Sequence, residues 1–291
     1  MLELSNKTVW MYWGQGWDNA PHLVKRCRQS WETLNQGYQI IALDSHSVNE
    51  YLDIPSSIGV DRSDISIATV SDFIRIGLLA KHGGVWVDAT AMCAEPLDDW
   101  LPEYFSSGFF AFRNPGKDRL FSSWFLVAEP ENILAAKIYK EFCHFLSSNS
   151  FPNQYNVTGK IFRSIFKIRW NRNTATTIGW HSEFARKTLK TYPYFIFHYT
   201  FNKIILENDE LHQIWESSKP FKARLPHQIQ IFSRQLHKIE KAESFILSRQ
   251  APVHKLNRRR NTDSKYWATV LNTLETTNNQ YKLHSLDGDK I

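Results

Sequence analysis

The stretch IATVSDFIRIGLLAKH (residues 67–82), followed at once by GGVWVD (residues 83–88), decides the fold. Its apolar residues recur at the helical period and predict a helix over 67–82: Ile67, Val70, Ile74, Leu78 and Leu79. The pair Gly83-Gly84 ends this helix, because glycine adopts the left-handed cap conformation without strain. Val85 to Val87 then predicts a short strand, with Asp88 at its carboxyl end.

The residues upstream repeat this alternation of strand and helix. Residues 9–13 predict a buried strand closed by the turn at 14–16, residues 21–34 predict a helix, and residues 39–43 predict a second strand. A β-α-β-α-β order implies a mostly parallel sheet covered by helices. Ligands bind at the carboxyl ends of such strands, so Asp88 is expected to be a ligand-handling carboxylate.

The pattern is less regular downstream of this half. We predict strands at 109–112, 124–128 and 194–199, and the last of these carries His198. Helices are predicted at 133–146, 158–168, 204–215 and 229–247. The final forty or so residues are polar and basic, with no clear core face at the very end.

The composition limits the classes of protein. The 291 residues are 42% hydrophobic and 14% aromatic, which suits a large core and also suits the binding of nucleosides and sugars. The net charge of +6 fits an anionic ligand or a membrane surface and is too modest to indicate nucleic-acid binding. Three scattered cysteines, no secretory leader and no apolar stretch of spanning length lead us to expect a cytoplasmic protein with at most peripheral membrane contact.

Asp72 and Arg75 form the candidate site together with Asp88. They are three residues apart on the predicted helix, so they share a face, and the Gly-Gly turn brings that face toward the end of the strand. One carboxylate could hold a ribose or a base and another a divalent metal, while the arginine binds an anion or orients the carboxylates. Periodicity alone does not single out this site, because Asp72 and Arg75 could form a surface ion pair and Asp88 could cap a turn.

These residues also carry a family resemblance. SDFIR (71–75), LL (78–79) and HGGVWVDAT (82–90) resemble a signature of capsular polysaccharide synthesis proteins. The same signature marks the wider group of glycosyltransferases with a DXD sugar-binding region, which includes initiating mannosyltransferases. VWMYWGQG (9–16), followed by Ala20-Pro21, resembles the first strand and the helix start of the capsular group. The resemblance is good from about residue 8 to 98, weaker at 123–125 and 194–202, and absent after about 220.

The resemblance implies the fold and the activity. It implies an α/β domain of the GT-A type, a Rossmann-like mixed sheet flanked by helices, over residues 1–220. Its nucleotide-sugar half would be about 1–100 and its acceptor half about 101–220, followed by a helical, basic C-terminal extension over 221–291. The implied activity is bacterial hexosyl transfer from a nucleotide-sugar donor, with UDP preferred, to a capsule or lipopolysaccharide glycan or glycolipid, with retention of configuration.

The resemblance also assigns roles to residues. Asp72 and Arg75 match nucleotide-sugar contacts, Asp88 matches the first DXD carboxylate, and Asp88 and Arg75 are the expected catalytic pair. Trp10, Tyr12 and Trp13 match the strand whose aromatic rings approach the base. The implied cofactor is Mn²⁺ or Mg²⁺, for which Asp88, Thr90 and His198 are the candidate ligands.

Thr90 departs from the family pattern, because the wider group has its second Asp there. Threonine is a poor metal ligand beside a carboxylate, so both how the metal is held and whether it is needed at all stay open. One alternative is therefore a nucleotide-sugar-binding protein that has lost transfer activity. A hydrolase with paired carboxylates is disfavoured, because the carboxylates lie beside an arginine and no second acidic pair stands at comparable positions.

A basic cluster near the C-terminus is the candidate membrane contact. It consists of His254-Lys255 and Arg258-Arg259-Arg260. The cluster is expected to bind the anionic inner face of a membrane, where lipid-linked acceptors are made; the alternatives are a solvated tail and a segment packed on the catalytic domain.

Overall fold

The computed structural model describes residues 3–59, 62–257 and 264–288. A central sheet has the strand order β2-β1-β3-β6-β5, formed by β1 Thr8–Tyr12, β2 Gln39–Leu43, β3 Gly84–Asp88, β5 Phe109–Gly116 and β6 Arg119–Ala128. Strand β1 pairs in parallel with β2 and β3, whereas β6 is antiparallel to both β3 and β5. The expected parallel arrangement is confirmed for the first three strands, and the whole sheet is mixed.

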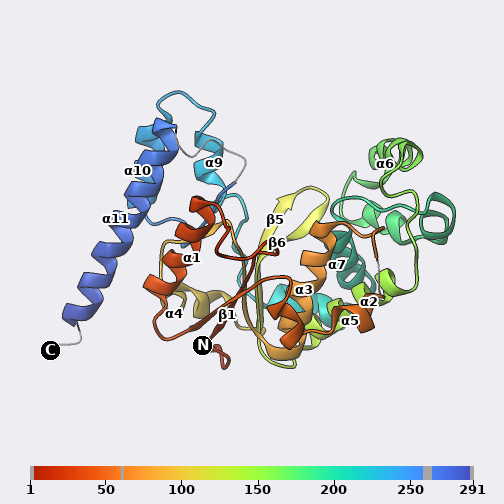
Figure 1. The fold of residues 1–291 in the computed structure, drawn as a ribbon, viewed down its shortest axis with the longest axis horizontal. Helices are drawn as coiled ribbons and strands as arrows, with labels where there is room; N and C mark the ends of the chain where they lie inside the picture. The colour runs from red at the N-terminus through yellow and green to blue at the C-terminus, as the bar shows by residue number, and fades with distance from the viewer. Residues whose placement is uncertain (1–2, 60–61, 258–263, 289–291) are drawn as a thin grey trace.

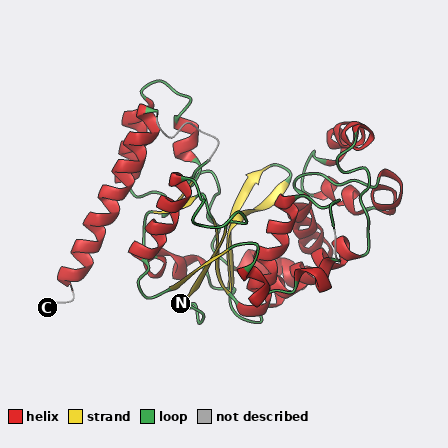
Figure 2. Ribbon diagram, viewed as in Figure 1, coloured by secondary structure: helices red, strands yellow, loops and turns green. Residues whose placement is uncertain are grey.

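Helices cover both faces of this sheet (Figures 1 and 2). One face carries α2 Ile54–Ile58, α3 Ile67–His82, α5 Ile133–Ser147 and α7 Ile196–Glu207, with α6 Val157–Trp170 beyond them and α8 Asp209–Ser217 after α7. The other face carries α1 His22–Leu34 and α4 Leu97–Trp100. The side chains of each strand alternate between these faces, so Trp10 and Trp86 enter one core cluster while Val9, Met11, Val85 and Val87 enter the other.

Helix α3 begins and ends as its sequence predicts. The Ser66 hydroxyl accepts a hydrogen bond from the Thr69 amide at 3.1 Å and so caps the first turn. Gly83 and Gly84 follow the helix with φ angles of 69° and 92°. A Cβ on Gly84 would lie 2.6 Å from the Thr8 carbonyl oxygen, so the chain can return into the sheet here only through glycine.

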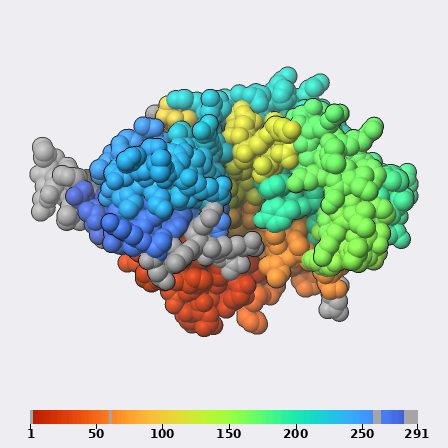
Figure 3. Space-filling view, turned by 90° about the horizontal axis from the view of Figure 1, so that it is seen from above, coloured from red at the N-terminus to blue at the C-terminus, as the bar shows by residue number. Residues whose placement is uncertain are grey.

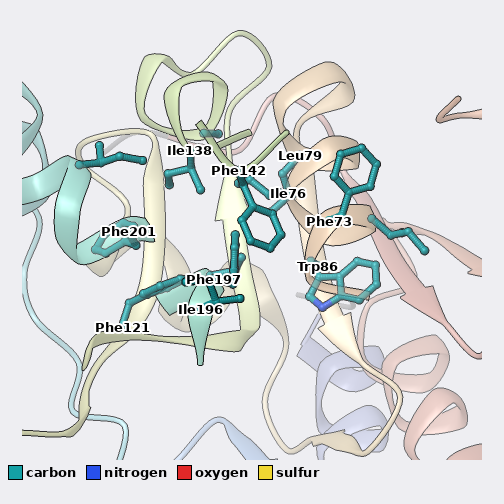
Figure 4. Packing of buried hydrophobic residues seen from close by; sticks show 14 of the residues in the cluster. Phe73, Ile76, Leu79, Trp86, Phe121, Ile138, Phe142, Ile196, Phe197 and Phe201 are labelled. Atoms are coloured by element: carbon teal, nitrogen blue, oxygen red, sulfur yellow. The ribbon is translucent and has the colours of Figure 1, made fainter. Parts of the chain in front are cut away.

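The core beneath α3 fixes this helix against the sheet. Ile76 and Leu79 lie beside Phe142 of α5, and Phe73 lies above Trp86 of β3 (Figure 4), all within one core cluster. The three α3 side chains are fully buried. Since the apolar face of α3 is held here, its Asp72 and Arg75 are directed toward the end of the sheet.

The C-terminal part of the chain differs from the prediction of a polar tail. A second sheet pairs β4 Ala91–Cys93 with β7 Val253–Lys255 in antiparallel register. Around it pack α9 Gln228–Phe232, α10 Lys238–Leu247 and α11 Lys265–Gly288, which share a core cluster with residues of α1. In Figure 3 this segment, in blue, lies at the end of the molecule opposite the green segment that contains α6.

Three predicted elements were wrong. The aromatic run at 194–199 is not a strand, because Ile196 begins the buried helix α7. The helix predicted at 204–215 is two helices, since Asn208 leaves the helical conformation and its side chain caps α8 at the Leu211 amide. The helix predicted at 229–247 is likewise divided into α9 and α10.

Candidate active site

A cavity of about 810 Å³ opens at the carboxyl ends of β1 and β3. Tyr12 and Asp88, the last residues of these two strands, are paired across the sheet, so both face this edge. The other walls come from α3, the start of β6, the start of α7 and the C-terminal segment. The position agrees with the expected ligand site of a parallel sheet.

Arg75 stands at the centre of the polar floor, and its side chain joins both carboxylates. The guanidinium lies 2.9 Å from Asp72 Oδ1 and 3.2 Å from Asp88 Oδ1. It also donates to the Ser123 carbonyl at 2.9 Å and to the Ser71 hydroxyl at 3.2 Å. Because Arg75 is only 6% exposed and its terminal nitrogens already bind protein oxygens, it positions the carboxylates rather than offering a free fork to a ligand.

Lys255, from the C-terminal part of the chain, joins Asp72, Arg75 and Asp88 in a ring of four charged side chains. Its ammonium lies 2.8 Å from Asp88 Oδ2 and 2.7 Å from the Thr90 hydroxyl. Strand pairing fixes this position, since Lys255 is opposite Ala91 in the β4–β7 ladder and the Leu256 amide donates to the Thr90 carbonyl at 2.8 Å. The residues predicted as a C-terminal extension therefore contribute to the same cavity as the first hundred.

The two carboxylates have different proton affinities. Burial raises the pKa of Asp72 to about 7, and the nearby Asp88 charge adds to this while Arg75 opposes it. Burial alone would also raise the pKa of Asp88, but Lys255 and Arg75 outweigh it and hold the pKa below its usual range. Asp88 is therefore an anion at neutral pH, whereas Asp72 keeps its proton to a higher pH than an exposed aspartate does.

Two histidines line the cavity in their neutral form. Burial, with help from Arg119 and Arg75, holds the pKa of His198 well below its usual range. Burial, with Lys255 and Arg119, lowers the pKa of His227 to about 4. His198 was predicted to lie on a strand, but it projects from the first turn of α7 between Phe121 and Phe195.

The three predicted metal ligands are Asp88, Thr90 and His198, and the first two already have protein partners. Asp88 Oδ1 accepts from the Trp86 indole at 3.1 Å and contacts Arg75, while Asp88 Oδ2 and the Thr90 hydroxyl both contact Lys255. The described part of the chain contains no group of three His, Cys, Asp or Glu side chains able to hold a metal ion. The donor set does not fit a divalent cation as it is arranged here, because an ammonium already lies between the two predicted oxygen ligands.

Of the three aromatic residues predicted to contact the base, two line the cavity and one does not. Tyr12 and Trp13 line the cavity, but Trp10 lies outside its lining and is 3% exposed. The Trp10 indole donates to the Gly83 carbonyl at 2.9 Å and packs on Tyr51, so it stabilises the turn after α3. A contact between Trp10 and a bound base is therefore not supported by its position.

Several cavity residues were not predicted from the sequence: Ser123, Trp124, His227 and Lys255. Ser123 and Trp124 could have been found, because they fall in the region of weaker resemblance at 123–125. His227 carries no such signal. Lys255 was identified only as a member of an exposed basic cluster, whose other members at 258–260 lie outside the described residues.

Comparison with known proteins identifies the family. The family described as capsular polysaccharide synthesis protein matches residues 2–274. The chain belongs to this family. An O-glycosyltransferase, PaGT, of Phomopsis amygdali is 30% identical to this capsular family member over 140 residues, which are 42% of the chain and 34% of PaGT.

Other relatives of this capsular family member also have glycosyltransferase names. A putative glycosyltransferase, HOC1, of Saccharomyces cerevisiae is 27% identical over 103 residues, covering 34% of the chain and 26% of the yeast protein. An uncharacterised glycosyltransferase of Acanthamoeba polyphaga mimivirus is 25% identical over 157 residues, covering 52% and 60%. The chain thus spans less than two thirds of the length of these relatives.

A solved structure, the PaToxG glycosyltransferase, aligns with 94% of the chain and 87% of its own length at 11% identity and a TM-score of 0.38. Within the described ranges, no helix is both long and apolar enough to cross a lipid bilayer.

Proposed function

We propose that this capsular polysaccharide synthesis family member is a glycosyltransferase that moves a hexose from a nucleotide-sugar donor to a glycan or glycolipid acceptor. The observation that carries the proposal is the ring of Asp72, Arg75, Asp88 and Lys255 at the carboxyl edge of the sheet. It lies in a cavity large enough for a small-molecule ligand, and three of its four members, Asp72, Arg75 and Asp88, belong to the stretch that resembles the family signature. The relatives named glycosyltransferases support the same activity.

The cavity supplies what sugar transfer from a diphosphate requires. The leaving diphosphate is an anion, so a cation must balance it, and the sugar and base need polar and aromatic contacts. Asp88 is a fixed anion, and about a quarter of its side chain is exposed. We propose that it accepts a hydrogen bond from a hydroxyl of the nucleotide sugar. Tyr12, Trp13 and Trp124 provide ring faces for the base or the sugar.

Arg75 acts in this proposal by holding Asp72 and Asp88 in place. A small displacement of either carboxylate would misalign the anomeric carbon and the acceptor, which costs rate steeply. The finer features follow the family resemblance: a UDP-linked donor, a capsule or lipopolysaccharide acceptor, and retention of configuration. The predicted Mn²⁺ or Mg²⁺ ion would have to displace Lys255 from Asp88 and Thr90, and no step of the proposal depends on it.

A donor screen tests the proposal. Wild-type protein is incubated with radiolabelled UDP- and GDP-sugars and a mixture of glycan acceptors, in parallel with Asp88→Ala. We expect transfer or slow donor hydrolysis by the wild type and its loss in Asp88→Ala, whose circular dichroism should match the wild type. The control is Asp98→Asn, an exposed carboxylate paired with Lys7, which should keep full activity.

The other outcomes identify the competing activities. Saturable binding of a nucleotide sugar with no turnover would favour the binding protein that has lost transfer, with Thr90 at the altered position. Cleavage of glycans without any nucleotide would favour the hydrolase. Normal turnover by Asp88→Ala would mean that the active site lies elsewhere.

A further inference from the structure

Lys255 lies between Asp88 and Thr90, two of the residues that the family resemblance offers as metal ligands. In the DXD pattern that this stretch resembles, the second position is a carboxylate, and here it is Thr90. The Lys255 ammonium lies between the remaining carboxylate and the threonine hydroxyl, 2.8 Å from Asp88 Oδ2 and 2.7 Å from Thr90 Oγ1. A hydroxyl and one carboxylate suit an ammonium with three donors better than they suit Mn²⁺ or Mg²⁺.

The structure holds this ammonium in place by several independent contacts. Strand β7 fixes the Lys255 backbone against β4, the Lys255 amide donates to the Pro226 carbonyl at 2.9 Å, and Gln230 donates to the Lys255 carbonyl at 2.6 Å. The side chain is only 15% exposed and passes near the Trp124 ring. A long flexible side chain with no role would face solvent, so its burial beside Asp88 indicates a positioned charge.

We propose that the Lys255 ammonium is the cation that binds the diphosphate of the donor, in place of a divalent metal. The inference rests on the proposed glycosyltransferase function. In the transfer step, the bond between the anomeric carbon and the diphosphate oxygen breaks, and its electron pair leaves with the nucleoside diphosphate. A bond forms between that carbon and the acceptor oxygen, whose proton passes to the departing phosphate. Lys255 balances the negative charge that develops, and nothing is oxidised or reduced.

Binding and turnover with and without a chelator test this inference. The probes for calorimetry are UDP and GDP, each titrated into the wild type, Lys255→Gln and Lys255→Arg in EDTA and then in Mn²⁺. We expect one of the two nucleotides to bind the wild type equally well in both conditions. Lys255→Gln should bind it at least tenfold more weakly in EDTA and lose about a hundredfold in turnover, as when one charge-stabilising donor is removed. Lys255→Arg keeps the charge and should bind more tightly than Lys255→Gln.

The results that would overturn the inference are separate from those that would overturn the function. If wild-type binding or turnover disappears in EDTA and returns with Mn²⁺, the metal is the cation and the Lys255 assignment is wrong, while the glycosyltransferase stands. Wild-type behaviour of Lys255→Gln in EDTA would also overturn the assignment. If no nucleotide binds and no donor is used under any condition, both proposals fail. Equal thermal midpoints for the two variants would exclude misfolding as the cause of any difference between them.

An independent feature lies at the other end of the molecule, on helix α6. Four of its apolar side chains recur along one face and are largely exposed: Val157 at 70%, Ile161 at 52%, Ile165 at 56% and Ile168 at 80%. Phe166 and Trp170 stack on each other on the side that packs against the rest of the chain. Helix α6 therefore has an inner aromatic face and a second, outward apolar stripe.

The charge around this stripe is concentrated in the same segment. Residues 151–194 contain eight Lys and Arg and a single acidic residue, Glu183, a net charge of +7 against +6 for the whole chain. Lys160, Lys167 and Arg169 on α6 itself are exposed, and Arg172 follows its end. Figure 1 shows α6 at the periphery of the fold, where a flat surface could approach it.

We also propose that this face, Val157 to Arg172, binds the surface of an anionic lipid bilayer. An amphipathic helix with an apolar stripe beside basic residues lies in the bilayer interface, and the basic residues add attraction to anionic headgroups. A protein partner would bury the stripe equally well, but it would have to supply a large acidic surface to match the +7 charge. The C-terminal cluster gives less support for membrane contact, because His254 is buried and Lys255 is paired inside the cavity.

Vesicle sedimentation tests the membrane proposal. The probes are vesicles of phosphatidylglycerol with phosphatidylcholine, and vesicles of phosphatidylcholine alone. We expect the wild type to sediment with the anionic vesicles at low salt and to be released at high salt. Ile161→Gln/Ile168→Gln should weaken binding about tenfold, and Lys167→Gln/Arg169→Gln about twenty-fivefold, near fivefold per charge. Leu236→Gln, an exposed leucine at 83% in another part of the chain, is the matched control and should bind as the wild type does.

Two results would overturn the membrane proposal. One is equal sedimentation of the wild type and both double variants. The other is a concentration-dependent self-association, abolished by Ile161→Gln/Ile168→Gln, in a protein that does not bind anionic vesicles, which would assign the stripe to a second copy of the chain.

Discussion

Replacing Arg75 by lysine tests the central interaction of the candidate site. The Arg75 guanidinium contacts five oxygens: Asp72, Asp88, the carbonyl and hydroxyl of Ser123, and the Ser71 hydroxyl. A lysine ammonium keeps the charge but has three donors and no planar fork, so it cannot bridge both carboxylates and both serines. Arg75→Lys should therefore lower stability and misplace Asp88.

The expected loss of stability in Arg75→Lys follows from the contacts that are lost. At least two of the five contacts disappear, and one of the two carboxylates is left without its partner in a buried site. Neutral hydrogen bonds are each worth about 1 kcal/mol and the removal of a buried charged partner about 3–5 kcal/mol, so we expect a loss of about 3 kcal/mol in the free energy of unfolding. For a chain of this size that is a fall of roughly 6–12 °C in the thermal midpoint.

Arg113→Lys is the matched control. Arg113 is also 6% exposed, lies on the Trp215 ring and donates to Glu216 and to the Ser218 carbonyl, yet it does not line the cavity. Both variants should melt at lower temperature, but only Arg75→Lys should lose nucleotide binding and turnover at a temperature where both are folded. Wild-type melting and turnover by Arg75→Lys would refute the role of the network.

Three further predictions concern the floor of the cavity, its wall and the turn after α3. Folded Asp72 holds a proton at a pH where the unfolded chain has released it, so its contribution to stability is complete below about pH 4 and is lost as the pH rises through about 7. The difference in unfolding free energy between Asp72→Asn and the wild type should therefore shift in favour of the variant between pH 5 and pH 8, and a constant difference measured by urea titration would contradict this. Trp124→Ala should weaken nucleotide binding about tenfold in calorimetry, consistent with the loss of one stacked ring. Trp10→Phe should leave nucleotide binding unchanged and reduce only the stability of the fold. Weaker nucleotide binding by Trp10→Phe would show that Trp10 does contact the bound nucleotide.

The part of the fold that sequence alone predicts is the part with local signals. Helix α3 has an uninterrupted apolar period and a Gly-Gly stop, and both act within a few residues. The same holds for β1, α1 and β2. This local structure also places Asp72 and Asp88 in one cavity. The helix that precedes a parallel strand begins at the edge of the sheet where that strand ends, so the first turns of α3 and the end of β3 lie close together.

The features that were not predicted depend on contacts between distant residues. Strands β4 and β7 have three residues each, which is too short for an alternation of apolar and polar residues that would distinguish them from a loop. They are also about 160 residues apart, so no local signal indicates that they pair. The sequence around Lys255 shows only charge, and charge runs usually face solvent, which is why the sequence alone could not choose between a membrane contact, a solvated tail and packing on the catalytic domain for the cluster at 254–260. The aromatic residues at 195–199 suit a strand by propensity, but their burial on several sides favours a helix.

Charge balance connects these observations. Asp72 and Asp88 cancel Arg75 and Lys255, and Arg119 at the wall is paired with Asp118, so the site without ligand is close to neutral when Asp72 is ionised. A nucleotide-sugar diphosphate adds two negative charges to this set. Asp72, with its pKa near 7, is the carboxylate that can take up a proton, and the anion beside it would raise that pKa further. Donor binding near neutral pH should then be accompanied by proton uptake and should weaken as the pH rises above 7, because each ionised Asp72 must be protonated before the anion is accommodated. Calorimetric binding enthalpies that do not change between buffers of different ionisation enthalpy would show that Asp72 does not take part.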